Sequence, residues 1–373
     1  MPDTGVAQQD MHLRFALALH QAMVPDPGVT ACWSPFSVAG ALGLVASGAR
    51  GATRDELTTL LLGTADGEPA ELAELLSGAT TLDQHRSAPV LGVSNTLWTR
   101  AGIPVHGEFA GEALAWPHGA IREAPFADDP DRATQRINAD VSDATHGLIP
   151  ALIGPGAVRP ATAVIVVNAL YLKAAWLTAF PVDGTEPRPF HSPGSSTEVP
   201  TMRLTARLGY AAVEGWQVVS VPAAGGVDAV LLLPGGELSD AAIAVDHRTL
   251  AALLAATEPT RVELFLPKFQ VRHSAQLTQA LRRTGVPTMF TDQADLSGIS
   301  STPVTVDQVL HEAVLTIDEH GLEGAAATAA AARLVAMVHQ PEPVVVRVDR
   351  PFLLLVRHHR TGVIYFFARI VRP

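Results

Sequence analysis

One pair of residues in this chain has the types that hold a catalytic metal ion. His311 and Glu312 open the sequence HEAVL, which would begin a zinc-binding HExxH motif. That motif needs a second histidine one helical turn after the first, and Leu315 occupies this position. Without this second histidine, the motif is incomplete and does not indicate a metal site.

Other residue types that carry catalysis are also poorly placed for it. His358 and His359 are adjacent in an expected strand, so their side chains would point to opposite faces, and we interpret them as solvated residues of an edge strand. No GxSxG elbow occurs, and neither Lys173 nor Lys268 follows a glycine-rich phosphate loop. We expect that the chain is not an enzyme; a hydrolase is the alternative that a turnover assay would expose.

The most informative segment, residues 319–340, has no chemistry of its own. It reads EHGLEGAAATAAAARLVAMVHQ, and the small side chains from Ala325 to Ala332 cannot catalyse a reaction. Alanine favours helices, so a helix or a linker is one interpretation. The other is a segment that is exposed in one state and becomes a buried β-strand in another.

Strand geometry favours the second interpretation. Alternate residues of a strand point to opposite faces, so Glu323 and Arg333 would share one face. The other face would carry Leu322, Gly324, Ala326, Thr328, Ala330, Ala332 and Leu334. This separation of charged from small or apolar side chains is typical of a half-buried strand.

Length and composition predict one large domain. The chain has 373 residues, of which 47% are hydrophobic and 17% charged, which suffices for a sizeable core. Length alone would favour two domains. However, the candidate linkers, residues 154–160 and 181–200, are flanked by apolar runs and are interpreted as turns within one core. We therefore expect a single domain over residues 1–373.

The net charge of −11 excludes nucleic acid and anionic membrane surfaces as main partners, because both need clustered lysines and arginines. All basic residues except Lys173 and Lys268 are arginines, which indicates a GC-rich, bacterial coding sequence. Cys32 is the only cysteine, so no intramolecular disulfide can form, and its apolar neighbours predict a buried thiol.

The N-terminus has no pattern of a secretory signal. Acidic residues occur where a signal peptide needs basic ones, and Arg14 interrupts the apolar stretch from Leu13 to Leu19. No run reaches the roughly 18 apolar residues that a membrane span needs. We expect no membrane association and either a cytoplasmic location or export by a non-classical route; the sequence leaves the compartment open.

Helical patterns dominate the first part of the chain. Ser34 followed by Pro35 is typical of an N-cap and a first helical residue, and predicts a helix that runs towards Ala46. Thr53 and Glu56 have the spacing of a capping box for the next helix. Two more helices are expected over residues 12–23 and 131–145.

Strand patterns dominate the second part. Ala163 to Val167 is a continuous apolar run that suits a central strand buried on both faces. Further strands are expected over residues 229–233, 262–271, 304–317, 344–348, 352–357 and 363–371. Helices followed by strands, without βαβ alternation, predict the α+β class with antiparallel or mixed sheets.

Ordered motifs along nearly the whole chain resemble the serpin family. They are SPFS at residues 34–37 with ALGLVASGARGATRDEL after it, IN at 137–138 with ATHGLI, VNALYLK at 167–173 with Trp176, LPKF at 266–269, ADLSG at 294–298, residues 309–321, RPF at 350–352 and residues 361–369. The resemblance implies a single α+β domain with three β-sheets, about eight or nine helices and an exposed reactive-centre loop over about residues 319–343.

The activity that the resemblance implies is inhibition of serine proteases by a suicide substrate. A protease attacks the exposed loop and forms an acyl-enzyme, and the cut loop then inserts into the central sheet and traps the protease in a covalent complex. Counting from the hinge glutamate Glu319 as in the family puts the reactive bond at Val335-Ala336, which suits an elastase-like enzyme. The alternatives are Arg333-Leu334 for a trypsin-like enzyme and Met337-Val338 for a chymotrypsin-like one.

The resemblance also assigns roles to residues away from the reactive bond. The hinge would comprise Glu319, Gly321, Leu322, Glu323, Gly324, Ala325, Ala326, Ala327 and Thr328. The shutter, a polar cluster that holds the central strands together, would comprise Ser34, Ser37, Asn168 and His311. Trp176 would lie over the breach, where the loop enters the sheet. Leu322 departs from the family's usual threonine or serine, and its bulk would slow the first step of insertion.

The expected partner is a serine protease, bound covalently by a monomer that needs no cofactor or metal. Serpins that respond to heparin carry a basic helix, whereas residues 68–76 read EPAELAELL and are acidic, so heparin is not expected to bind. The alternative within the same fold is a non-inhibitory serpin that acts as a binding or storage protein.

Overall fold

The computed structural model describes residues 4–83, 88–238, 245–322 and 342–373. These ranges contain eight α-helices, none of which combines the length and the apolar character of a membrane span. The helices are α1 (Thr4–Met23), α2 (Pro35–Gly48), α3 (Gly51–Leu62), α4 (Pro69–Gly78), α5 (Gly107–Glu112), α6 (Pro130–Ala144), α8 (His247–Ala255) and α9 (Thr278–Arg283).

The described strands form a six-stranded and a nine-stranded sheet. The six-stranded sheet has the order β10 (Phe269–Gln276), β11 (Val306–Ile317), β12 (Gly321–Leu322), β4 (Val164–Ala175), β2 (Val90–Arg100) and β3 (Gly119–Ala124). The nine-stranded sheet has the order β1 (Ala31–Trp33), β15 (Ile364–Ile370), β14 (Phe352–His358), β8 (Val227–Pro234), β7 (Trp216–Ala223), β6 (Ser195–Val213), β9 (Glu258–Pro267) and β13 (Val344–Arg347), and β5 (Glu186–Ser192) also pairs with β6.

The larger sheet divides within its longest strand. Residues 209–213 of β6 pair with β7, whereas residues 201–210 pair with β9 and residues 195–201 with β5. The strand therefore joins two groups, one that continues through β7 to β1 and one that contains β5, β9 and β13. With the six-stranded sheet, these groups give the three-sheet α+β architecture that the sequence predicts.

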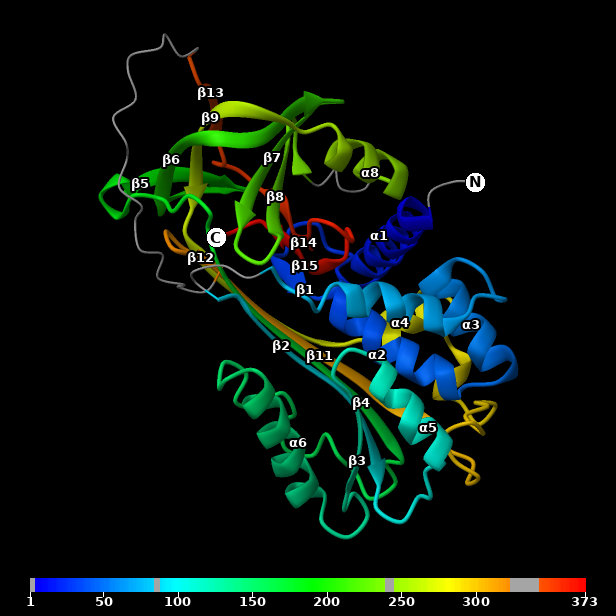
Figure 1. The fold of residues 1–373 in the computed structure, drawn as a ribbon. Helices are drawn as coiled ribbons and strands as arrows, with labels where there is room; N and C mark the ends of the chain where they lie inside the picture. Colours follow the sequence, from blue (N-terminus) through cyan, green and yellow to red (C-terminus); the bar gives the residue numbers. More distant parts are fainter. Residues whose placement is uncertain (1–3, 84–87, 239–244, 323–341) are drawn as a thin grey trace.

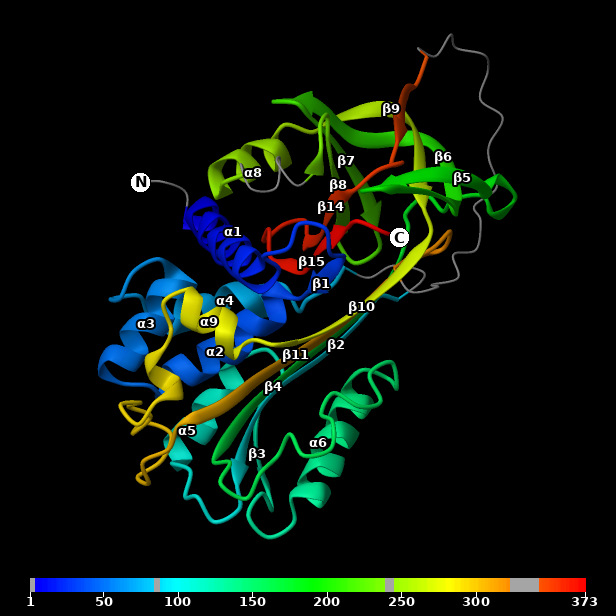
Figure 2. The same ribbon diagram turned by 180° about the vertical axis from the view of Figure 1, so that it is seen from behind.

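The six-stranded sheet separates two layers of helices. In Figure 1 it crosses the molecule diagonally, with α6 on one side and the group of α2, α3 and α4 on the other. The opposite view in Figure 2 shows β10 and β11 lying side by side along this sheet. Ile137 and Val141 of α6 pack with Ile165 and Val167 of β4 in a core of their own, because both sides present apolar residues there. The strand β4 is buried on both faces, as predicted.

The helix α2 forms where its N-terminal signal predicts. The Ser34 hydroxyl accepts a hydrogen bond from the Ser37 N–H at 3.0 Å, and Pro35 is the first helical residue. The helix continues to Gly48, two residues beyond the predicted Ala46. Nearly all of its residues are buried because it packs against both sheets. It therefore brings polar side chains at its start to the middle of the molecule.

The capping box predicted for α3 is wrong. This helix begins at Gly51, and Thr53 instead accepts a hydrogen bond from the Asp295 N–H at 3.0 Å. The Glu56 carboxylate accepts one from the Thr288 N–H at 2.9 Å. Both polar side chains therefore accept hydrogen bonds from the backbone of a loop that is distant in the sequence. The local spacing of these residues cannot distinguish such a tertiary contact from helix capping.

Two strand predictions also need correction. The expected strand over residues 262–271 is two strands, because the chain leaves the nine-stranded sheet after β9 and enters the six-stranded sheet as β10, with Lys268 between them. Residues 181–200, predicted as a turn region, contain β5 and the start of β6, which form a hairpin. The proline-rich composition of this segment obscures its pairing.

The environment of the two adjacent histidines, His358 and His359, differs from the predicted solvated edge strand. They do point to opposite sides, since His358 is fully buried whereas the side chain of His359 is 67% exposed. The strand β14 is not an edge strand, because it pairs with β15 on one side and β8 on the other. His358 therefore faces the core and shares a hydrogen bond of 2.9 Å with the Thr361 hydroxyl. Cys32 is buried, as predicted, and burial raises the pKa of its thiol.

Candidate functional site

The centre of the six-stranded sheet is a seam between two parallel strands, β4 and β11. Their residues pair from Val164 with Val306 up to Leu170 with Ala313, and beyond this point the direct pairing ends. The outer neighbours of these two strands, β10 beside β11 and β2 beside β4, are joined to them by longer ladders. A new strand that enters this sheet between β4 and β11 must break the pairs of this one ladder.

The upper end of the seam already holds the start of the predicted hinge. Leu322 pairs antiparallel with Ile317 of β11 on one side and with Ala174 of β4 on the other. It is fully buried, and directly opposed residues of adjacent strands share a face, so its side chain faces the core together with these two. The two-residue strand β12 is thus a wedge between the two strands of the seam.

A tight turn delivers this wedge to the sheet. The Asp318 carboxylate accepts hydrogen bonds from the backbone N–H groups of His320 and Gly321, at 2.8 and 3.1 Å. A side chain at Gly321 would place its Cβ 2.2 Å from the carbonyl oxygen of Ala174. Only glycine therefore allows the chain to approach β4 closely enough to pair with it.

Glu319 fastens the turn from outside the sheet. Its carboxylate lies 2.7 Å from the Lys268 ammonium group and accepts a hydrogen bond of 2.9 Å from the Thr185 hydroxyl. Burial alone would raise the pKa of Glu319, but the hydrogen bonds and the charge of Lys268 outweigh it, so the pKa lies below its usual value. The carboxylate is therefore charged at neutral pH and holds the hinge to the junction of β9 and β10.

Trp176 lies directly beside this turn, at the end of β4. Its indole N–H donates to the Asp318 carbonyl at 2.8 Å, and its backbone N–H donates to the His320 carbonyl at 3.0 Å. Its ring packs edge-on against Phe180, and its backbone bridges to Ala223 of β7. The residue predicted for the breach is therefore in contact with the hinge turn on one side and with the larger sheet on the other.

Below the wedge, the four residues predicted for the shutter lie together. The Ser34 N–H donates to Nε2 of His311 at 3.0 Å, and Nδ1 of His311 lies within hydrogen-bond distance of Oδ1 of Asn168. The Asn168 amide donates to the Ser37 hydroxyl at 2.6 Å. Because His311 and Asn168 are opposite one another in β11 and β4, this network crosses the seam. All four residues are fully buried.

A fifth member of this network was not predicted from the sequence. The Asn95 carbonyl oxygen, on β2, accepts hydrogen bonds from the Asn168 amide at 2.6 Å and from the Ser37 hydroxyl at 3.0 Å. Its own amide donates to the Pro117 carbonyl at 2.9 Å. An asparagine in the middle of a strand is a signal that could have identified it, since asparagine is rare in strands and a buried amide needs hydrogen-bond partners.

The histidine of the network is neutral at physiological pH. The pKa of His311 is lowered to about 3, chiefly by burial and also by the charge of His273, although the hydrogen bond to Asn168 acts in the opposite direction. Because Nε2 accepts from Ser34, the ring proton resides on Nδ1 and is donated to Asn168. Every strong hydrogen-bonding group of the imidazole is thus used.

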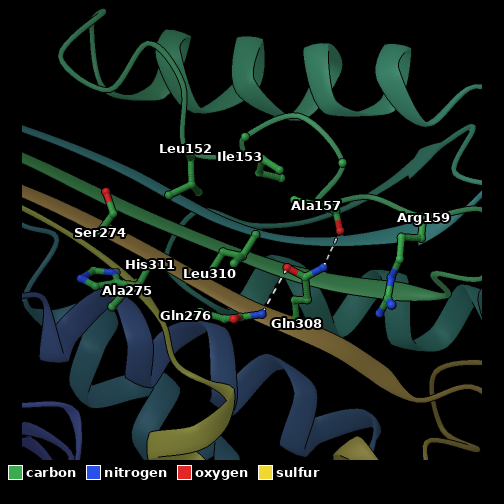
Figure 3. Close-up of a pocket in the computed structure, with 12 residues that line it drawn as sticks. Leu152, Ile153, Ala157, Arg159, Ser274, Ala275, Gln276, Gln308, Leu310 and His311 are labelled. Atoms are coloured by element: carbon green, nitrogen blue, oxygen red, sulfur yellow. Dashed lines mark hydrogen bonds between the residues drawn. The ribbon is translucent and has the colours of Figure 1, made fainter.

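On the opposite face of the sheet, the loop after α6 also crosses the seam. The Gln308 amide of β11 donates to the Ala157 carbonyl at 2.7 Å, and Gln276 of β10 reaches Gln308 (Figure 3). Asn138 of α6 accepts from the N–H groups of Leu152 and Ile153, both at 2.9 Å. A cavity of about 500 Å³ lies between this loop and β10 and β11. Because α6 packs on β2 and β4 and the loop after it bonds to β11, this loop connects the strands on the two sides of the seam.

The remaining predicted residues of the loop lie outside the described part of the chain. They are Glu323, Gly324, Ala325, Ala326, Ala327 and Thr328 of the hinge, and Arg333, Leu334, Val335, Ala336 and Met337 around the reactive bond. The described part of the site therefore consists of a seam between β4 and β11, a two-residue strand at its upper end and a buried polar network below it.

Comparison with known proteins agrees with this geometry along the whole chain. A family profile described as Serpin (serine protease inhibitor) matches residues 11–373. Iripin-2 of Ixodes ricinus is 32% identical over 369 residues, which cover 96% of this chain and 91% of that protein. Leukocyte elastase inhibitor of Bos taurus is 30% identical over 379 residues, with 96% and 98% covered.

The solved structures extend the likeness to the fold. Human thyroxine-binding globulin superposes with a TM-score of 0.86 over the full length of both chains, at 24% identity. At this identity the match speaks for the fold alone. Together, the match over residues 11–373, the curated relatives and the described seam lead to one conclusion. The chain belongs to the serpin family.

Proposed function

We propose that this protein inhibits a serine protease as a suicide substrate. The protease serine oxygen attacks the carbonyl carbon of Val335, the bond to Ala336 breaks, and the amine of Ala336 leaves as a new N-terminus. Val335 is then held to the protease as an ester, and insertion of the cut loop into the seam precedes hydrolysis of that ester. The observation that carries the proposal is β12, a first pair of loop residues seated between β4 and β11.

The register of β12 supports insertion by extension of the same strand. Leu322 pairs with Ile317 and Ala174 in antiparallel directions. Six residues further along the loop is Thr328, and six residues back along the two partners are His311 and Asn168. An inserted loop in this register would therefore bring the Thr328 hydroxyl between the two shutter residues that bond to each other across the seam. The hydroxyl could replace the hydrogen bond that strand separation breaks.

The energetics favour insertion once the loop is cut. A strand of about a dozen residues gains roughly 1 kcal/mol net for each backbone hydrogen bond, which amounts to on the order of 10 kcal/mol. Small side chains enter a packed sheet without the clashes that larger ones cause. Leu322 is larger than the glycine and alanines that follow it in the hinge. It is already buried between β4 and β11 at the top of the seam, so its side chain does not have to enter the sheet after cleavage.

The target class follows from the reactive bond. Valine before the bond and alanine after it suit an elastase-like protease, and one relative is a leukocyte elastase inhibitor by name. Cleavage at Arg333-Leu334 would instead indicate a trypsin-like target, and cleavage at Met337-Val338 a chymotrypsin-like one. Mass spectrometry of the released peptide after incubation with each protease distinguishes the three bonds.

The test is a denaturant-stable complex with the protease. We expect a covalent complex on denaturing gels with an elastase-like enzyme, and a large rise in the thermal unfolding temperature after loop cleavage. Cleavage of the loop without any complex, and without a change in unfolding temperature, would contradict inhibition. That result would favour the alternative of a non-inhibitory binding or storage protein with the same fold.

A further inference from the structure

The outer face of the β5-β6-β9-β13 group concentrates positive charge on an acidic protein. Cross-strand pairs place Arg203 and Arg347 on either side of Phe265, and Arg207 opposite Arg261. Paired residues of adjacent strands share a face, and Arg188 of β5 reaches the same ring. We call this set the arginine face; its arginines are Arg188, Arg203, Arg207, Arg261 and Arg347.

Phe265 organises the centre of the arginine face. The guanidinium carbons of Arg188, Arg203 and Arg347 lie 4.5, 5.8 and 5.5 Å from the centre of its ring. These guanidinium groups lie over the ring, and Phe265 as a residue is only 6% exposed. The ring attracts the cations and limits their motion, so the guanidinium groups are held at the surface in a defined arrangement.

The charge of the arginine face is only partly compensated. Glu186 pairs with Arg188 at 3.2 Å, and Glu263 accepts from Nε of Arg203 at 2.7 Å. In the ranges that the structure describes, Arg207 and Arg347 form no ion pair, and both are exposed. Arg207 and Arg347 thus carry two uncompensated positive charges on a chain whose net charge is −11. This local excess of positive charge fits an acidic partner.

The arginine face is next to the place where a protease must bind. The strand β13 begins at Val344, nine residues after Val335. An extended chain spans at most about 3.5 Å per residue, so a protease engaged at the proposed bond stays within about 30 Å of β13. Figure 1 places β5, β6, β9 and β13 together at the end of the molecule opposite α6. A bound protease would therefore face these strands.

We propose that the arginine face is an exosite that recognises carboxylates beside the substrate cleft of the target protease. The proposal rests on the proposed inhibitory function, which supplies the protease. Planar guanidinium groups match carboxylates in two hydrogen bonds, and exposed charges act mainly on the rate of encounter. The arginine face would accelerate association with an acidic protease and leave the later trapping step unchanged.

The experiment combines charge reversal on both proteins. The inhibitor is tested as wild type and as the double variant Arg207→Glu and Arg347→Glu, against an elastase-like protease and a variant of it whose acidic residues beside the cleft are neutralised. We expect the association rate of the wild-type pair to fall about tenfold or more with the inhibitor variant at low salt. The same change should have little effect with the neutralised protease or at high salt.

The control is Arg132→Glu, which makes the same kind of charge change in the exposed first turn of α6, far from the arginine face. It should leave the association rate unchanged. Equal rates for wild type and double variant with the acidic protease would overturn the exosite, and so would binding of polyphosphate at this face without any coupling to the protease. Loss of covalent complex even for the wild type would instead refute the proposed function, so the two failures are distinguishable.

Discussion

The carboxylate of Glu319 and the ammonium group of Lys268 lie 2.7 Å apart, at the point where the hinge turn meets the junction of the two sheets. Lys268 is the residue between β9 and β10, so the pair connects the start of the loop to both sheets. The position of the hinge thus depends on a contact between residues 51 positions apart in the sequence.

Removal of this ion pair should loosen the hinge. We expect Glu319→Gln to lower the free energy of unfolding by about 1 kcal/mol, because the lysine is partly exposed and solvent screens the pair. Lys268→Met, which keeps the apolar stem, should cause a similar loss, and the double variant should cost little more than either single one. Urea denaturation measures this cycle; additive losses would show that the two groups do not interact.

The pH dependence of Glu319 has a defined sign. Since its pKa is lowered in the folded protein, its contribution to stability is present above the unfolded value of 4.5 and is lost as the pH falls through the folded pKa. In Glu319→Gln this acid-induced loss should be smaller than in the wild type. An identical acid profile would contradict the role of the charged carboxylate.

The buried histidines should destabilise the protein at mildly acidic pH. The pKa of His311 is lowered to about 3, that of His20 to about 3 and that of His12 to about 4, in each case first by burial. Above the unfolded pKa of 6.5 these histidines are neutral in both states and do not oppose folding. Below pH 6.5 each buried histidine lowers the free energy of unfolding by about 1.4 kcal/mol per pH unit, until the pH reaches its folded pKa. The free energy of unfolding should therefore fall between pH 6.5 and 4.5. His311→Gln should reduce this slope, and an unchanged slope in this variant would contradict a buried neutral imidazole at position 311.

The asparagine that joins the network should matter for stability. Asn95→Ala removes the acceptor of Asn168 and Ser37 in a buried site, and we expect a loss of about 2 kcal/mol in the free energy of unfolding. The matched control is Thr99→Val on the same strand, because the buried Thr99 hydroxyl has no hydrogen-bond partner in the described structure. This control should be neutral or slightly stabilising, and equal losses in both variants would contradict the role of Asn95.

The register of β12 predicts a position-specific effect within the loop. In Thr328→Arg, insertion would bring a charge between His311 and Asn168, so we expect cleavage without trapping, with the fraction of covalent complex strongly reduced. Thr328→Ser keeps the hydroxyl and should trap normally. The ratio of complex to cleaved inhibitor on a denaturing gel measures the effect, and full complex formation by the arginine variant would refute this register.

Much of the site could be predicted from the chain itself. Local signals were sufficient for the N-cap at Ser34, for the buried strand around Val164 and for a thiol buried at Cys32, because each depends on neighbours in sequence. The order of motifs identified the family, and with it the polar residues that meet below the seam. The local features need only residue type and short-range spacing, whereas the set of polar residues follows from the family resemblance.

Tertiary structure alone decided the rest, because strand pairing joins residues far apart in the chain. No local pattern distinguishes a two-residue strand such as β12, whose place depends on Ile317 and Ala174. The change of sheet at Lys268 and the burial of His358 likewise follow from which strands become neighbours. The arginine face exists only after four strands align their outward residues around Phe265, and its charge is hidden in a sequence that is acidic as a whole.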